Sequence, residues 1–397
     1  MTTIPSHKEI QALVDRLLLE QGRLDPFELL LAADLLAYED YEAWRTGARP
    51  DLESVLHGSP AEIAELLEQA ADYARRQKLE PTPLAHGAWG GASTRLSVGP
   101  SRKLEKACAE SWAPAAERMQ LDLFHDSSER LLEEAIRLAL AERRLDAARA
   151  QVSQLAREHP RHPDLRGYLR LIQCLDDSAV ASPGMRAADR IAELEGIEPL
   201  ARQLLGHRAR DLLAVLWAAL AERLDDRDFD PADPRLHPSH AWARAGRWEA
   251  VRASIECVEH WADWALLLER HAEAAWRRRD IAAARQDWLR LCWEYPPEAE
   301  RLLRGANFPD PWLARLWRDF EDLEALLETE DFPAWLLLQE SVGAPPPPPE
   351  RAPADERGDP YRLLHLMVSG DDDIALRRQL DEIHPELLRQ YLRRRAR

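Results

Sequence analysis

LLEEAIRLALAERRLDAARAQVSQLAREHP, residues 131–160, aligns without a gap with LLERHAEAAWRRRDIAAARQDWLRLCWEYP, residues 267–296. Both stretches have an apolar first half, a charged middle, a second apolar half that starts on small alanines, and a final proline. The identical pairs include Leu131/Leu267, Leu132/Leu268, Ala139/Ala275, Arg143/Arg279, Ala147/Ala283, Ala148/Ala284, Arg149/Arg285, Leu155/Leu291, Glu158/Glu294 and Pro160/Pro296. Such self-similarity indicates an architecture of repeated supersecondary units.

Each copy predicts two helices joined by a short charged turn. The apolar residues of each half recur at steps of three and four, which places them on one helix face. In the first copy they are Leu131, Leu132, Ala135, Leu138 and Ala139, followed by Ala148, Val152 and Leu155. The closing proline ends the second helix, because it has no amide donor and its ring clashes with the preceding turn. The predicted fold class is therefore all-α, with helical hairpin repeats.

These positions resemble the tetratricopeptide repeat family. The large, small and proline positions of that family correspond to Leu132, Ala135, Ala139, Ala148, Val152, Leu155 and Pro160, and to Leu268, Ala272, Ala275, Ala284, Trp288, Leu291 and Pro296. A third, partial copy spans His240–Trp264, with Gly246 at the turn between its helices. Arg279 follows Gly246 by 33 residues, close to the family period of roughly 34.

The resemblance covers residues 129–176 and 232–300. Ile136 and His271 depart from it, since the family has small or leucine-like residues there, and most copies lack the turn glycine. The resemblance implies a tetratricopeptide-like α-solenoid that binds protein partners, and it implies no particular reaction.

The chain is strongly acidic, with 71 Asp and Glu residues against 53 Lys and Arg and a formal net charge of −18. Because nucleic-acid binding rests on clustered Lys and Arg, this balance disfavours a nucleic-acid partner and favours a protein partner. The cysteines at 108, 174, 257 and 292 have no paired metal or redox spacing, so we expect no cofactor. No membrane span or signal pattern is visible, and we expect a cytoplasmic location.

Linker composition and helix-start signals predict the organisation of the chain. The signals include the capping boxes Ser6/Glu9 and Ser59/Glu62, and Pro199 is predicted to open one helix that ends near Leu224. The predicted segments are an N-terminal helical unit at 1–80, an irregular connector at 81–125 with a short helix and a short extended piece at Arg95–Val98, a first helical-repeat block at 126–224, a linker at 225–238, a second, Trp-rich helical-repeat block at 239–340, a Pro-rich linker at 341–360, and a C-terminal helical hairpin with a basic tail at 361–397. The tail is either a cap on the repeat array or a docking peptide.

Clusters of metal-ligand residue types have simpler interpretations in this chain, so we expect no metal site. His159 and His162 follow Glu158 but lie beside prolines at a turn, where side chains usually face water. Glu256 and His260 are four apart on an expected helix and form a surface pair. The acidic residues of the front unit wrap around their helix and are expected to form a solvated face; they are Asp34, Glu39, Asp40 and Glu42.

The Trp-rich block is the predicted partner-binding region. Residues 242–335 carry ten of the 14 tryptophans, a residue favoured in cores and at interfaces alike. Trp288 is at a helix-packing position and is expected in the core, whereas Trp276 is on the face that lines the inner groove of tetratricopeptide-like arrays. The predicted partner-binding residues are Glu269, Glu273, Trp276, Arg277, His240, Arg244, Glu133 and Arg137.

Three hypotheses for function follow. The first is a non-catalytic scaffold that binds a protein or peptide partner in a groove, in an oligomeric state that the sequence leaves open. The second is a regulatory module in which Pro345–Pro349 folds back onto an aromatic groove. The third is an enzyme of unrecognised class, which we disfavour because the chain has no nucleophile elbow, phosphate loop or metal quartet.

Overall fold

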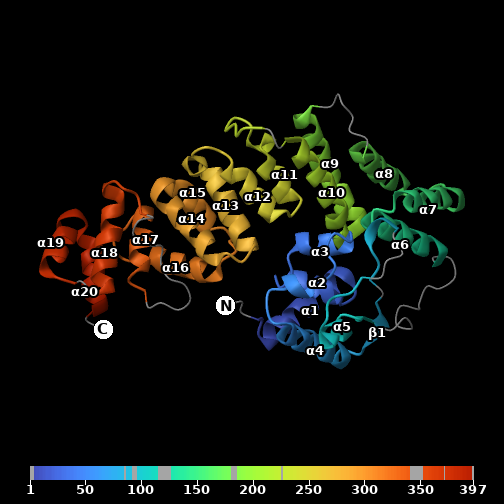
Figure 1. The fold of residues 1–397 in the computed structure, drawn as a ribbon, viewed down its shortest axis with the longest axis horizontal. Helices are drawn as coiled ribbons and strands as arrows, with labels where there is room; N and C mark the ends of the chain where they lie inside the picture. Colours follow the sequence, from blue (N-terminus) through green and yellow to red (C-terminus); the bar gives the residue numbers. More distant parts are fainter. Residues whose placement is uncertain are drawn as a thin grey trace. The chain divides into compact units, whose positions relative to one another are not determined.

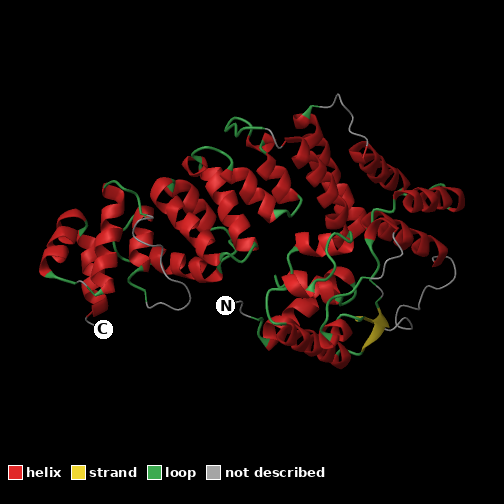
Figure 2. Cartoon of the chain, in the orientation of Figure 1, coloured by secondary structure: helices red, strands yellow, loops and turns green. Residues whose placement is uncertain are grey.

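The computed structural model describes residues 4–84, 86–91, 96–114, 127–179, 186–224, 227–339, 352–370 and 372–395. These residues are predominantly helical, as predicted, with one small two-stranded sheet (Figure 2). The chain divides into two compact units, residues 1–247 and 248–397. None of the described helices is long and apolar enough to cross a bilayer.

Unit 1 contains the helices drawn from blue to green in Figure 1. They are α1 (His7–Gln21), α2 (Pro26–Ala32), α3 (Tyr38–Arg45), α4 (Pro60–Arg76), α5 (Arg102–Ala107), α6 (Ser127–Ala141), α7 (Leu145–Glu158), α8 (Leu165–Ala179), α9 (Ala187–Leu205), α10 (Ala209–Leu224) and α11 (Pro238–Arg244). Strands β1 (Leu79–Pro83) and β2 (Glu110–Pro114) pair antiparallel, with Leu79 opposite Pro114.

Unit 2 continues the succession of helices in yellow to red. They are α12 (Trp248–Glu256), α13 (Ala265–Arg277), α14 (Ile281–Glu294), α15 (Pro296–Leu303), α16 (Pro311–Glu321), α17 (Phe332–Leu336), α18 (Asp359–Ser369), α19 (Ile374–Ile383) and α20 (Pro385–Arg395). The two aligned stretches of sequence form the hairpins α6–α7 and α13–α14.

The turn inside each hairpin has the same backbone geometry. Arg143, Gly246 and Arg279, which the alignment makes equivalent, all have a left-handed conformation, with φ of 59°, 70° and 63°. In each turn the next amide donates to a carbonyl five residues back, from Arg144 to Ala139, from Arg247 to Trp242 and from Asp280 to Ala275. This is the Schellman ending, which satisfies carbonyls that a helix leaves without partners. The alignment therefore predicted these turns correctly.

The second helix of each hairpin stops the same way. His159 (φ −130°, ψ 66°) and Tyr295 (φ −138°, ψ 61°) leave the helical region, and each precedes a proline. His384 (φ −150°, ψ 74°) repeats this geometry before Pro385. A residue before proline is pushed out of the α region by the proline ring.

The predicted connector 81–125 is not a separate, irregular segment where it is described. Its apolar residues are buried in the same cluster as α1–α4, and they include Leu96, Val98, Leu104, Cys108 and Trp112. The predicted extended piece at 95–98 is not a strand at residues 96–98, and Arg95 lies outside the described residues. The sheet consists instead of β1 and β2, which pair with each other across a long connection.

The prediction that Pro199 opens a helix is wrong. Helix α9 begins at Ala187 and passes through Pro199, and Gly206 (φ 59°, ψ −132°) separates it from α10. An internal proline costs about 3 kcal/mol. The residues buried upstream of it, Ile191, Leu194 and Ile197, each contribute about 1.5–3 kcal/mol on burial and offset that loss.

The acidic string in the front unit is only partly a solvated face, because Asp34 is exposed but Asp40 and Glu42 are buried. Glu42 of α3 is 1% exposed, and its carboxylate forms ion pairs with Arg143 and with Arg247, the latter at 2.7 Å. Tyr38 donates a hydrogen bond to Asp211 of α10 at 3.0 Å. These contacts join α3 to the α6–α7 turn, to α10 and to the end of α11. The front helices are thus anchored to the α6–α7 turn and to α10 within unit 1.

The C-terminal hairpin is part of the core of unit 2. Tyr361, Leu364, Leu380 and Leu387 are buried in one cluster with Trp293 and Trp317. This burial is that of a packed terminal element rather than of a free docking peptide. The Pro345–Pro349 run lies outside the described residues.

Candidate functional site

The predicted groove residues of α13 lie on one face of the helix. Glu269, Glu273 and Arg277 are spaced by four residues, which places them one above another. All three line one pocket in unit 2, with a volume of about 250 Å³. The other lining residues are Trp288 of α14, Arg301 and Leu302 of α15, and the loop Gly305, Ala306, Asn307, Phe308 and Pro309.

The floor of this pocket is aromatic. Trp288 is 2% exposed, as expected for a core residue, and its ring centroid lies 4.7 Å from that of Phe308. Trp276 lies 5.6 Å from Trp288 and is half-buried. Trp276 is not among the lining residues, and its contribution is the ring contact with Trp288.

The rim carries balanced charges. Arg301 donates to Glu269 at 2.6 Å, and Arg277 lies 3.5 Å from Glu273. Arg277 also lies over the ring of Trp248, 5.5 Å from its centroid. Exposed ion pairs contribute only about 0–1 kcal/mol each, so these side chains can exchange partners when a ligand arrives.

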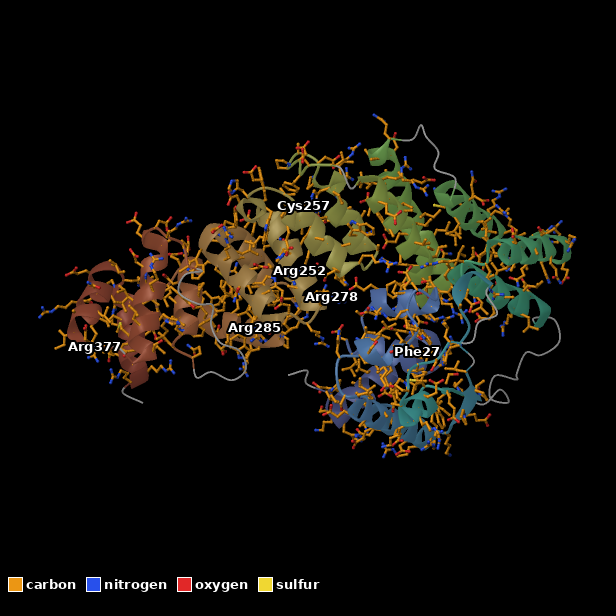
Figure 3. The ribbon with its side chains drawn as sticks, in the orientation of Figure 1. Phe27, Arg252, Cys257, Arg278, Arg285 and Arg377 are labelled. Carbon is orange, nitrogen blue, oxygen red and sulfur yellow. The ribbon has the colours of Figure 1, made fainter. Side chains whose placement is uncertain are left out.

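The loop that forms the far wall is fixed at Asp310. This carboxylate is 1% exposed and accepts from the backbone amides of Trp312 at 2.9 Å and Leu313 at 3.1 Å, where it caps α16. Arg285, labelled in Figure 3, donates to it at 2.6 Å and stacks over the Trp312 ring. The ion pair holds α14, the loop and α16 together, so the pocket is preformed.

The equivalent residues of the first copy make internal contacts. Glu133 aligns with Glu269, and it accepts from Arg137 at 3.1 Å and from His162 at 2.8 Å. Arg137 aligns with Glu273, and its Nε donates to the carbonyl of Leu204 at 2.9 Å. Arg137 also lines a polar pocket of about 360 Å³ beside the α9–α10 junction. The two copies therefore use the same positions differently.

His240 and Arg244 do not join the α13 pocket. The guanidinium of Arg244 lies 5.2 Å from the ring centroid of Trp217 and forms an ion pair with Glu198. The ring of His240 meets Trp217 edge-on at 5.7 Å. Both side chains pack within unit 1 against the buried tryptophan of α10.

His162 is buried rather than facing water as predicted. Its Nδ1 accepts from the Asp164 amide at 3.1 Å, so Nε2 carries the proton that points at Glu133. Glu133, His162 and Asp164 have the spacing of a metal cluster. A metal ion on Nε2 would leave a protonated Nδ1 facing the Asp164 N–H, an unfavourable pairing of donors. The arrangement matches a structural hydrogen bond better than a metal ligand.

His271 is a buried residue that contacts two neighbouring helices. The sequence identifies it only as a departure from the tetratricopeptide pattern. The ring is 6% exposed and bonds Asp287 of α14 at 2.6 Å and Glu256 of α12 at 3.1 Å. Trp261 stacks on it, with ring centroids 4.4 Å apart. The alignment of the two copies offered a signal for this site, because the residue of the first copy that aligns with His271 is the small, apolar Ala135.

The predicted surface pair of Glu256 and His260 does not form. His260 lies beyond the end of α12 with a left-handed backbone (φ 53°), and its Nε2 is 3.5 Å from Glu259. Glu256 faces His271 instead. The helix ends one turn too early for the four-residue spacing to align the two side chains.

Comparison with known proteins adds no relative. Neither a protein-family model, nor a curated protein, nor a solved structure matches the chain.

Proposed function

We propose that the protein is a non-catalytic scaffold and that unit 2 binds a peptide segment of a partner protein in the α13 pocket. The observation that carries the proposal is the convergence of Glu269, Glu273 and Arg277, chosen from sequence, on one pocket with an aromatic floor. The resemblance to tetratricopeptide repeats supports it, because in that family the same helix face lines a partner groove.

The size of the pocket favours a single anchor side chain. Small-molecule sites usually have volumes of about 300–1,000 Å³. A pocket of about 250 Å³ is smaller, but it accommodates one Leu, Phe or Trp side chain from a peptide. Such a buried anchor supplies most of the binding energy at protein interfaces.

The rim defines the residues that flank the anchor. Two carboxylates, Glu269 and Glu273, alternate with two guanidinium groups, Arg277 and Arg301. A peptide with one basic and one acidic residue beside its apolar anchor pairs its basic residue with a rim carboxylate and its acidic residue with a rim guanidinium group. The net acidic charge of the chain favours protein over nucleic acid as the source of this ligand.

The test is selection from a random peptide library on the intact protein, followed by affinity measurement with a pocket-filling variant. Ala306 is exposed and lines the pocket, so Ala306→Trp should fill it without disturbing the core. We expect selected peptides to share one large apolar residue and to bind the variant at least about tenfold more weakly.

Ala253→Trp is the matched control, because Ala253 is exposed on α12 and does not line the pocket. It should bind the selected peptides as the wild type does. Equal binding to Ala306→Trp, or a selection without any shared apolar anchor, would exclude the α13 pocket as the partner site.

A further inference from the structure

A second pocket, in unit 1, has a different character. It lies beside α5 and has a volume of about 420 Å³, within the range of small-molecule sites. Its lining residues are Leu84, His86, Leu96, Ser97, Gly99, Pro100, Arg102, Glu105, Lys106 and Ala109. None of them belongs to the predicted partner-binding set.

The loop that forms one wall of this pocket is held in place from several sides. The indole Nε1 of Trp44 donates to the Ser97 carbonyl at 2.8 Å, and the amides of Leu52 and Glu53 donate to the Val98 carbonyl at 2.8 and 2.9 Å. The Val98 amide in turn donates to the Glu105 carboxylate at 2.8 Å. The wall is therefore preformed rather than waiting to be ordered by a ligand.

The pocket carries an excess of positive charge. Arg102 and Lys106 are exposed on one face of α5, and within the described residues neither has an ion-pair partner. The acidic residue of the pocket lining, Glu105, already accepts a hydrogen bond from the Val98 amide.

His86 adds a neutral polar group to the inner wall. Its Nε2 donates to the Cys108 carbonyl at 3.0 Å, which leaves Nδ1 unprotonated as an acceptor. The ring packs edge-on against Phe27, with centroids 4.7 Å apart, and burial lowers its pKa. His86 therefore contributes a neutral ring to the lining and does not add charge.

We propose that this pocket binds a small organic anion, with a carboxylate or phosphate group between Arg102 and Lys106 and an apolar body against Leu84 and Leu96. Guanidinium and ammonium groups bind both anion types through charge-assisted hydrogen bonds. The apolar wall distinguishes such a ligand from a free inorganic ion. The site is independent of the α13 pocket and of the scaffold proposal.

The test is calorimetric titration of the full-length protein with hexanoate, hexyl phosphate, inorganic phosphate and 1-hexanol. We expect saturable millimolar or tighter binding of at least one of the two hexyl anions. The neutral alcohol and inorganic phosphate should bind at least about tenfold more weakly, because each lacks half of the recognised chemistry. The stronger of the two anions then identifies the head group.

Arg102→Gln/Lys106→Gln removes both charges from exposed positions and should weaken binding of that anion about tenfold or more. Lys103→Gln is the matched control, because Lys103 is on the same helix, faces Glu68 at 4.0 Å and does not line the pocket. Absence of binding by both hexyl anions would overturn the proposal. Equal loss in the control, or equal affinity for hexanol, would overturn it too.

Discussion

The Nδ1 of His271 lies 2.6 Å from the Oδ2 of Asp287, and the second ring nitrogen lies 3.1 Å from Glu256. One imidazole thus joins three successive helices, α12, α13 and α14. Burial lowers the pKa of His271, but hydrogen bonds and charge from Asp287 and Glu256 outweigh it, despite the opposing charge of Arg252, and the pKa is raised. The raised pKa therefore favours the imidazolium form of the ring over a wider pH range than in the unfolded chain.

This pair predicts a pH dependence of stability. Because the folded-state pKa of His271 is raised, its contribution is fully present below the unfolded-state pKa of about 6.5 and is lost as pH rises through the folded value. Burial raises the pKa of Asp287, so protonation of that carboxyl ends the contribution at acid pH. His271→Asn should therefore destabilise unit 2 more at pH 6 than at pH 8.5, by about 1–3 kcal/mol at pH 6.

Urea unfolding of wild type and variant between pH 5.5 and 9 measures this difference. His260→Asn is the control, because His260 is exposed and pairs only loosely with Glu259 at 3.5 Å. A destabilisation by His271→Asn that is the same at every pH would mean that the ring is neutral in the folded protein.

Hairpin turns and helix stops were predictable because they depend on local chemistry. The alignment of Arg143 with Arg279 predicted a shared turn, which the structure shows to be left-handed, and the alignment of Pro160 with Pro296 predicted a shared stop. Glu269, Glu273 and Arg277 were chosen because the resemblance to tetratricopeptide repeats implies that their helix face lines a groove, and in the structure all three line one pocket.

Contacts between distant segments were not predictable from the sequence. Glu42 has the composition of a solvated face, yet it is buried because Arg143 and Arg247 come from far along the chain. The wall of the α13 pocket depends on Asp310 meeting Arg285, a pairing without a local signal.

Glu42 is predicted to be critical for unit 1. Glu42→Ala leaves Arg143 and Arg247 without their shared carboxylate, and breaking a buried pair of this kind costs about 3–5 kcal/mol. Denaturant unfolding should show this loss as a shift of one cooperative transition. Glu65→Ala, on the exposed face of α4, should change stability by less than about 0.5 kcal/mol. Separate transitions for the front helices and the repeat block would contradict the anchoring role of Glu42.

The turn glycines allow backbone strain to be separated from packing. Gly22 and Gly246 both have φ of 70°, but a Cβ on Gly22 meets nothing within 4 Å, whereas one on Gly246 lies 3.3 Å from Cδ1 of Tyr38. Gly22→Ala should cost about 1 kcal/mol from the left-handed conformation alone. Gly246→Ala should cost more, because Tyr38 must also move. Equal losses in thermal or urea unfolding would mean that the Tyr38 ring accommodates the methyl group freely.

The C-terminal hairpin is predicted to be indispensable for unit 2. Tyr361 is fully buried against Trp293, with ring centroids 5.2 Å apart, and Arg394 donates to the Leu337 carbonyl at 2.8 Å. Removing residues 352–397 exposes these partners and several buried leucines, each worth about 1.5–3 kcal/mol. We therefore expect a chain truncated at 351 to lose cooperative unfolding in unit 2 and to bind a hydrophobic dye.

Truncation thus cannot test autoinhibition by the Pro-rich segment, because it removes core residues together with the proline run. Replacing Pro345–Pro349 by a Gly/Ser segment of equal length changes that run alone and keeps α18–α20 in place. If the run covers the α13 pocket, this replacement should raise the affinity for a selected peptide, and Ala306→Trp should abolish the gain. Unchanged peptide affinity in the replaced chain would leave the scaffold without a built-in inhibitor.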